Sequence, residues 1–412
     1  MLQPVTVTPS RRSLEFGIYR DGDNNLDAIQ ESTLSQALQT SARDAHVEFT
    51  VEDTTTLRSD GDAIVSGALH TERYTIADGE ISGARSGKPD IMSDEATLAR
   101  FVARTLDNAE ACGAKQTWID LVDHGGGDGG GLETGDGSCM AMPDIAKAIA
   151  DGVALHAGAH PEDRGREVDG VVANQCLMDT MGFADALSHA GIRYLAASPE
   201  TMLAPGVPSD VAHAIAAHEN DPAAMAKAVT NDVMRTKYDA GDFGGFGPAA
   251  AFDVLDLDPV KIAKAEAAIK RLNDDVATQA KDGGVRGAVR DDARGIDGMV
   301  RFPEGGKGLP WHADRPAIAF YDTLANDGRL NAILRDDARS AENAVSELVL
   351  AHRESAGFEP FGGADYSDAV GPTIHLPTSQ RAIDPWARAG VSETDNAFYR
   401  NVDEAAMTRV IA

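Results

Sequence analysis

The sequence predicts an α/β fold with a mostly parallel central sheet, and three observations carry that prediction. In roughly the first half of the 412 residues, short runs rich in β-branched and aromatic residues alternate with longer segments of helical periodicity. Strands separated by helices need crossover connections, which make neighbouring strands parallel. Hydrophobic residues make up 42% and charged residues 25% of the chain, the proportions of a folded globular protein.

The elements of the first half follow in a regular order. Strands are expected at 14–19, 47–51, 117–122, 168–173 and 194–197. Helices are expected at 25–42, 94–112, 142–150 and 180–190. Ser93 or Asp94 is the expected N-cap of the second helix, because a short polar side chain there can accept a hydrogen bond from the first turn.

The second half is expected to be mainly helical. Helical patterns cover 221–238, 259–281 and 327–357, and strand-like runs cover 249–255 and 372–377. Residues 282–316 are rich in Gly, Arg and Asp and are predicted to form a long loop or linker. Since the chain is longer than one ordinary domain of about 150 residues, we divide it into a core at 1–220 and a helical or mixed region at 221–412 that packs on the core.

Charge and composition exclude several classes of protein. Sixty-six acidic and 37 basic residues give a net charge of −29, which repels phosphate backbones and argues against nucleic-acid binding. No apolar run reaches the roughly 18 residues of a membrane span. The first residues lack the apolar core of a signal peptide, which predicts a cytoplasmic protein or the mature form of an exported one. Three cysteines do not form a disulfide framework.

Two of the predicted strands are followed by residues whose side chains could take part in catalysis. Strand 117–122 leads into Asp-His-Gly-Gly-Gly at 123–127, and strand 168–173 leads into Asn-Gln-Cys at 174–176. The carboxyl ends of parallel strands share one edge of a sheet, so His124 and Cys176 are expected to face one crevice. A thiolate could attack a carbonyl carbon there while the imidazole transfers the proton. A following helix N-terminus would lower the thiol pKa.

Each of these residues has a structural interpretation as well. A single cysteine is most often a small buried hydrophobic residue, a histidine at a strand end is most often a satisfied polar group, and a glycine run is most often a loop. Only their combination at two strand ends favours catalysis. The backbone amides of the glycine run and of Cys176 would then be placed to bind an oxyanion.

Several segments, in order, resemble the clostripain family of cysteine peptidases. They are DGDNNLD at 21–27, LVDHGGG at 121–127, NQCLM at 174–178, YLAASPET at 194–201, AAFDVLDLDPV at 250–260 and GPTIHLP at 371–377. The resemblance covers nearly the whole chain, and the histidine and cysteine motifs are its specific parts. It implies a caspase-like α/β/α sandwich in residues 1–220, with a helical C-terminal extension.

The resemblance also implies a set of roles. His124 would be the catalytic acid and base, and Cys176 would be the nucleophile of a cysteine endopeptidase that works through a thioester. The backbone of Gly125 would form the oxyanion hole together with that of Cys176. The family needs no acidic third member, and Asp123 is interpreted as structural because neighbours on a strand point in opposite directions.

Two departures from the family pattern concern substrate binding. The family has an acid two residues before the cysteine and another after a Pro-Gly pair, where this chain has Asn174 and Val207. A neutral amide and a valine cannot neutralise a buried guanidinium. We therefore expect no strict requirement for Arg or Lys before the scissile bond. Glu200 is the alternative acid that would keep a basic preference.

The sequence gives weaker indications for a cofactor or a metal than for the catalytic residues. The chemistry needs no cofactor, but the resemblance leaves a calcium requirement open. Residues 21–27 imitate the start of an EF-hand, yet Leu26 stands where that loop needs glycine, so a helix-capping turn is expected. His156 and His160 are four residues apart, but Gly158 and Pro161 favour a loop over a metal-binding helix. Cys139 is expected to be an incidental loop cysteine, with a second reactive thiol as the alternative.

Three functions remain in competition. The leading one is a thiol protease, a hydrolase that acts on protein or peptide substrates and has no nucleic-acid or membrane partner. The second is a non-catalytic clostripain-like module that binds peptides or proteins. The third is a thiol hydrolase or transferase that acts on non-peptide acyl groups. The sequence leaves the oligomeric state unknown.

Overall fold

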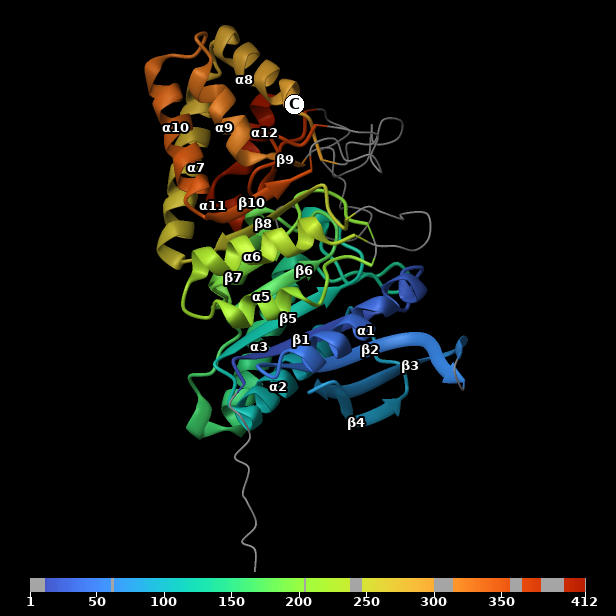
Figure 1. Ribbon diagram of the computed structural model, residues 1–412. Helices are drawn as coiled ribbons and strands as arrows, with labels where there is room; N and C mark the ends of the chain where they lie inside the picture. Colours follow the sequence, from blue (N-terminus) through green and yellow to red (C-terminus); the bar gives the residue numbers. More distant parts are fainter. Residues whose placement is uncertain are drawn as a thin grey trace, which may run out of the picture.

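A nine-stranded sheet runs through the part of the chain that the structure describes (Figure 1). This computed structural model describes 12–60, 63–203, 205–237, 247–299, 314–355, 365–378 and 396–411. The strand order is β10-β8-β7-β6-β5-β1-β2-β3-β4. In the described residues, no helix combines the length and the apolar character that crossing a membrane would require.

Five neighbouring strands in the middle of the sheet are parallel. They are β1 (Leu14–Asp21), β2 (Val47–Asp60), β5 (Gln116–Val122), β6 (Gly170–Asn174) and β7 (Tyr194–Ala197). All five were predicted from the sequence. Both edges are antiparallel: β3 (Ala63–Ala77) and β4 (Glu80–Gly87) continue beyond β2, and β8 (Ala251–Asp256) and β10 (Val349–Glu354) continue beyond β7.

Helices cover both faces of the parallel strands. On one face lie α2 (Glu95–Cys112), α3 (Met142–Ala159) and α4 (Met181–His189). On the other lie α1 (Asp27–Arg43), α5 (Val211–Ala217) and α6 (Pro222–Arg235). Side chains of β1 alternate between the two cores, with Phe16 and Ile18 in one and Tyr19 in the other. The predicted caspase-like α/β/α arrangement is confirmed.

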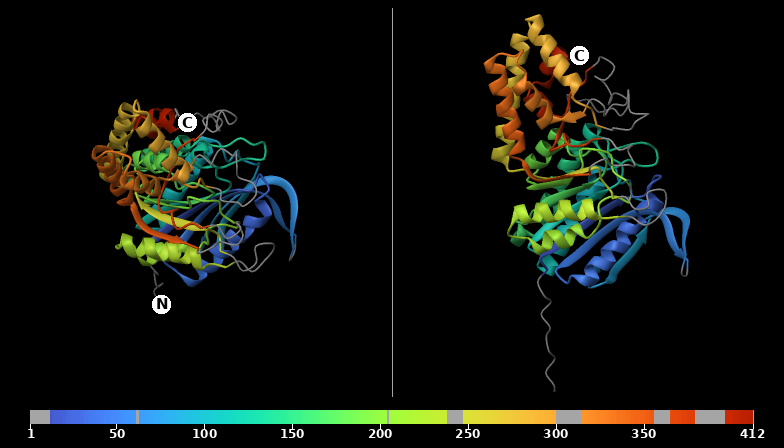
Figure 2. Two further views of the ribbon diagram at one scale, coloured as in Figure 1. Left: turned by 90° about the horizontal axis from the view of Figure 1, so that it is seen from above. Right: turned by 45° about the horizontal axis from the view of Figure 1, so that its top comes forward.

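The remaining helices gather beyond the β10 edge of the sheet (Figure 2). They are α7 (Pro259–Gln279), α8 (Gly283–Gly295), α9 (Ala317–Asn326), α10 (Ala332–Ser346), α11 (Ala397–Asn401) and α12 (Glu404–Ile411). A small sheet of β9 (Asp314–Pro316) and β11 (Thr373–His375) lies among them. Because β8 and β10 follow residue 220 in the chain, the large sheet continues across the expected boundary, and the division into two regions stays a prediction.

Three sequence-based expectations about local structure were wrong. Residues 283–295, expected in a loop, form α8, because Asp282 caps the helix at Gly284 and Ala288, Val289 and Ala293 are buried against neighbouring helices. Residues 314–316, the end of that expected loop, form β9, and 300–313 lie outside the described residues. Segment 327–357 contains both α10 and β10. The helix that begins at Met142 does not end at 150 but runs to Ala159, so His156 is helical and His160 is its C-cap.

Candidate active site

The ends of β5 and β6 bring His124 and Cys176 to the same edge of the sheet. Val122 of β5 is aligned with Asn174 of β6, and each of the two candidate residues lies two positions beyond this pair. Both residues are partly exposed. A β-carbon placed on Gly125 would overlap the carbonyl oxygen of Cys176 and lie 3.0 Å from its nitrogen. Only glycine permits this approach of the two backbones.

Further hydrogen bonds hold the two strand ends together. The side-chain Nε2 of Gln175 donates to the carbonyl oxygen of His124 at 2.9 Å. The backbone N–H of Asp123 donates to the carbonyl oxygen of Asn174 at 3.4 Å. Hydrogen bonds therefore join the loop that carries His124 to the loop that carries Cys176, and the role of Gln175 in this contact was not predicted from the sequence.

The imidazole of His124 has a partner that the sequence analysis missed. Its Nε2 lies 2.8 Å from Oδ1 of Asn25, the residue two positions before α1. Because an amide oxygen can only accept a hydrogen bond, Nε2 of His124 carries the proton and Nδ1 is the basic nitrogen. Burial lowers the pKa of His124, and Glu133 opposes this shift. The signal available in the sequence was the position of Asn25 shortly after β1, the strand next to β5.

The neighbouring acid, Asp123, has a structural position, as the alternation of side chains predicted. It is 2% exposed, and its Oδ1 accepts a hydrogen bond from Nδ2 of Asn24 at 2.6 Å. Burial raises its pKa well above the ordinary value, and Asp21 adds to that shift. Asp123 thus anchors the turn that places Asn25 beside His124.

The sulfur of Cys176 is bound by the backbone of a third segment. The N–H of Met202 donates to Sγ at 3.2 Å, and Sγ lies 3.7 Å from the carbonyl oxygen of the same residue. Burial raises the pKa of Cys176 to about 11, and the negative charges of Glu200 and Asp123 act in the same direction. The thiol is therefore neutral at pH 7.

The expectation that a helix N-terminus lowers this thiol pKa was wrong. Helix α4 begins only at Met181, and its N-cap is Thr180, whose side chain accepts a hydrogen bond from Phe183 N–H. Cys176 lies upstream, outside the first turn where the helix dipole acts. The chain instead turns sharply after the cysteine, because Leu177 has a φ of +67° and donates its N–H to the carbonyl oxygen of Glu200 at 3.1 Å.

The backbone amides of Gly125 and Cys176 belong to the two loops whose backbones come close together here. Among the residues that the structure describes, neither Gly125 N–H nor Cys176 N–H donates to a backbone carbonyl. These are the amides that the sequence analysis assigned to an oxyanion hole. Their close approach follows from the contact between Gly125 and the cysteine backbone.

The three residues expected to bind substrate are all buried. Asn174 is 2% exposed, Val207 is 1% exposed and Glu200 is 0% exposed. Asn174 and Val207 are in direct contact: Val207 N–H donates to Oδ1 of Asn174 at 2.7 Å, and Nδ2 of Asn174 donates to the Val207 carbonyl at 3.3 Å. Oε1 of Glu200 accepts from Thr201 N–H at 2.7 Å. Their roles toward substrate stay predictions.

The glycine-rich loop contains a second cysteine whose thiol pKa is raised. Cys139 is partly buried, with Sγ 3.7 Å from the carbonyl oxygen of Gly129. Burial raises its pKa, and Glu133 adds to the shift. An incidental loop cysteine fits this position better than a second reactive thiol.

Two residues of the EF-hand-like segment use their side-chain oxygens for contacts within the fold. Asp27 accepts hydrogen bonds from Thr55 Oγ1 and from the N–H of Thr56, while Asn25 bonds to His124. The segment forms a turn before α1, as expected, but the N-cap is Leu26 and no side chain caps the helix.

A buried polar cluster joins the glycine-rich loop to the C-terminal region. Asp128 accepts hydrogen bonds from Thr180 Oγ1 at 3.0 Å and from the hydroxyl of Tyr399. Nδ1 of His375 lies 2.9 Å from Oδ1 of Asp314, and one ligand atom each of Asp128, Asp314 and His375 lies within 4.8 Å of the others. Burial, together with Asp314, raises the pKa of Asp128 to about 7. Through this cluster, Asp314, His375 and Tyr399 contact the loop that follows His124.

Comparison with known proteins gives one consistent result. No protein-family model matches the chain, and no curated protein sequence matches it. A secreted C11 cysteine protease from Bacteroides thetaiotaomicron, solved with an irreversible peptide inhibitor, has a TM-score of 0.63 and 14% identity over 96% of this chain and 99% of that chain. The structure named iotapain, from the same organism, has a TM-score of 0.62 and 13% identity over 95% and 100%.

An inactive zymogen C11 protease from Parabacteroides distasonis is also similar. Its TM-score is 0.57, with 14% identity over 96% of this chain and 99% of that chain. At these identities the similarity establishes the fold. The chain therefore has the fold of C11, or clostripain-type, cysteine proteases over almost its whole length, as the sequence motifs implied.

Proposed function

We propose that this protein is a cysteine endopeptidase in which Cys176 is the nucleophile and His124 is the general acid and base. The observation that supports the proposal is the position of these two residues just beyond the ends of adjacent parallel strands, with the backbone of Gly125 close to that of Cys176. The shared fold supports it, since one protein of this fold was solved with an irreversible peptide inhibitor.

The reaction follows from these positions. Nδ1 of His124 takes the thiol proton as Sγ of Cys176 attacks the peptide carbonyl carbon, and the N–H groups of Gly125 and Cys176 bind the oxyanion. The imidazolium then gives its proton to the leaving amine, and a thioester remains. His124 next removes a proton from water, which attacks the thioester and releases the acid and the free thiol.

The resting site is a neutral pair. The raised pKa of Cys176 and the lowered pKa of His124 both disfavour a thiolate–imidazolium pair before substrate binds. We infer that the proton leaves the sulfur during the attack itself. Substrate that displaces Met202 from its contact with Sγ would free the thiol for this step.

A peptide probe with a thiol-reactive end group tests the catalytic assignment. The wild-type chain and the Cys139→Ala control should be labelled, whereas Cys176→Ala should not. A non-catalytic module would bind the peptide without being labelled. A hydrolase of other acyl groups would show no sequence-selective cleavage of a peptide library. Equal labelling of wild type and Cys176→Ala would contradict the proposal.

We further propose that a neutral residue precedes the scissile bond. The support is the buried Asn174–Val207 contact, which offers no carboxylate at the two positions where the family pattern has one. Matched reporter peptides that differ only in Ala, Leu, Arg or Lys at that position test it. Faster cleavage of the Arg and Lys peptides would overturn the assignment and favour Glu200 as the specificity acid.

A further inference from the structure

Two histidines and three acidic residues meet where the C-terminal ends of α2 and α3 lie side by side. His156 is in the last turn of α3 and His160 is its C-cap, so the two rings stack one helical turn apart, with centroids separated by 4.8 Å and planes inclined by 16°. Asp107 and Glu110 come from the end of α2, and Asp163 follows in a short 3₁₀ turn. The five residues thus come from three elements.

One carboxylate oxygen is shared by both rings. Oδ1 of Asp107 lies 2.7 Å from Nδ1 of His156 and 3.3 Å from Nε2 of His160. One ligand atom from each of these three residues lies within 4.8 Å of the other two. In a tetrahedral zinc site with bonds of about 2.1 Å, ligand atoms are about 3.4 Å apart. Small side-chain movements would bring the three atoms to that spacing.

The second nitrogen of each ring is held by a different carboxylate. Nδ1 of His160 lies 2.8 Å from Oε2 of Glu110, and Nε2 of His156 lies 3.4 Å from Oδ2 of Asp163. Metal-bound histidines generally donate the other ring N–H to a carboxylate, a backbone carbonyl or water, which fixes the ring and its tautomer. Here each ring has an outer carboxylate, and the remaining nitrogens, Nδ1 of His156 and Nε2 of His160, both lie near Asp107.

From this geometry we propose that Asp107, His156 and His160 bind a zinc-type dication, with Glu110 and Asp163 as outer partners. Nitrogen and carboxylate ligands suit zinc, cobalt or nickel, whereas calcium and magnesium prefer sites made only of oxygen. His156 is fully buried, and the side chain of Asp107 is 46% exposed, so water has access to the remaining ligand position.

Local charge also favours a dication. Four carboxylates surround the rings, those of Asp107, Glu110, Glu162 and Asp163, and Arg166 pairs with Asp163. Four negative charges and one positive charge leave an excess of three negative charges, of which a divalent cation would neutralise two.

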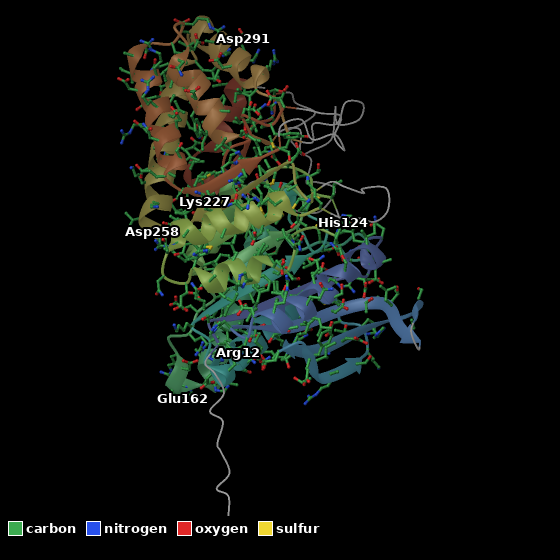
Figure 3. All side chains as sticks on the ribbon, viewed as in Figure 1. Arg12, His124, Glu162, Lys227, Asp258 and Asp291 are labelled. Carbon is green, nitrogen blue, oxygen red and sulfur yellow. The ribbon has the colours of Figure 1, made fainter. Side chains whose placement is uncertain are left out.

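The site lies far from the proposed active centre. α2 ends just before β5, and the 3₁₀ turn at Asp163 precedes β6, so the cluster is at the amino ends of these strands, whereas His124 follows the carboxyl end of β5. Figure 3 labels Glu162 and His124 well apart on the molecule. The ion would tie α2 to α3 and would take no part in the thiol reaction.

The test measures zinc binding to the full chain carrying Cys176→Ala, which removes the thiol of the proposed active centre as a competing ligand. We expect one zinc ion per chain by equilibrium dialysis, and a rise in Tm on zinc addition. His160→Gln or Asp107→Asn in this background should weaken binding at least tenfold and abolish the rise in Tm. Both positions are partly exposed, so these variants should fold.

A matched control and two outcomes decide the proposal. His189→Gln removes an exposed histidine elsewhere, with 66% of its side chain accessible, and should leave zinc binding unchanged. Failure of the Cys176→Ala chain to bind one equivalent, or equal binding by the His160→Gln and Asp107→Asn chains, would show that the cluster is an ion-pair network and overturn the proposal. Cobalt in place of zinc should show a tetrahedral absorption spectrum that the two variants lack.

Discussion

The side-chain oxygen of Asn25 lies 2.8 Å from Nε2 of His124, although 99 residues separate them in the chain. This contact fixes the ring and leaves Nδ1 as the nitrogen that can accept a proton. Among the described residues, no hydrogen bond to Nδ1 is present. An asparagine amide orients the ring without adding charge to the site.

Removal of this contact should impair turnover more than binding. In Asn25→Ala the imidazole can rotate and adopt the other tautomer, so we expect kcat to fall about 10- to 100-fold while KM changes little. Asn25→Gln or Asn25→Asp should recover part of the loss, and the exposed Asn220→Ala should have no effect. Steady-state kinetics over a range of pH values provide the measurement. A change confined to KM would contradict the role as a positioning residue.

The thiol of Cys176 should react slowly in the absence of substrate. With a pKa of about 11 for Cys176, only a small fraction is thiolate at pH 7. Alkylation by iodoacetamide should therefore accelerate about tenfold per pH unit from pH 7 to 10. Mass spectrometry of the peptide that contains the modified cysteine gives the rate. A plateau below pH 8 would show a preformed thiolate instead.

Substitution of Asn174 should change both specificity and stability. In Asn174→Asp the new carboxylate still accepts from Val207 N–H but is buried near Asp120, so we expect a destabilisation of about 1–3 kcal/mol at neutral pH. The same change should raise kcat/KM for Arg and Lys peptides relative to neutral ones. Asn220→Asp, far out on the surface, serves as the control. An unchanged ratio of kcat/KM values would show that this position does not contact substrate.

The contact between the two catalytic loops should not tolerate a side chain. The methyl group of Gly125→Ala would overlap the Cys176 carbonyl, so activity should be lost and the free energy of unfolding should fall by about 1–3 kcal/mol. Gly287→Ala, in open space within α8, should be neutral or slightly stabilising. Denaturant unfolding and peptide cleavage of both variants provide the measurement. An active, stable Gly125→Ala protein would contradict the geometry of the proposed oxyanion hole.

Burial of Asp128 should make stability depend on pH. Its folded pKa of about 7 lies above that of the unfolded chain, about 3.9, so its contribution is most favourable below the unfolded value and is lost as pH rises through 7. Asp128→Asn lacks this titration. The stability of wild type relative to Asp128→Asn should therefore fall by a few kcal/mol between pH 4 and pH 8. A difference that stays constant with pH would show that Asp128 is not protonated in this way.

The positions of the five parallel strands along the chain and the two candidate catalytic residues were predicted from the sequence. Strands β1, β5 and β6 are short runs of apolar and β-branched residues, and a buried parallel strand needs that composition on both faces. The sequence also predicted a close backbone approach at Gly125, because only glycine leaves room for another backbone at that distance. The strands β3 and β4 were missed: β4 is exposed along its whole length, and a solvated edge strand needs no apolar pattern.

Contacts between distant segments were decided only by the tertiary structure. The bond from Asn25 to His124, the contact of Met202 with Cys176 and the support of Asp128 by Tyr399 each join residues from different elements. Local sequence patterns report the periodicity with which one segment buries its own side chains. They do not report which polar groups meet across segments, nor how far burial shifts a pKa, since both depend on distances that exist only after the chain has packed.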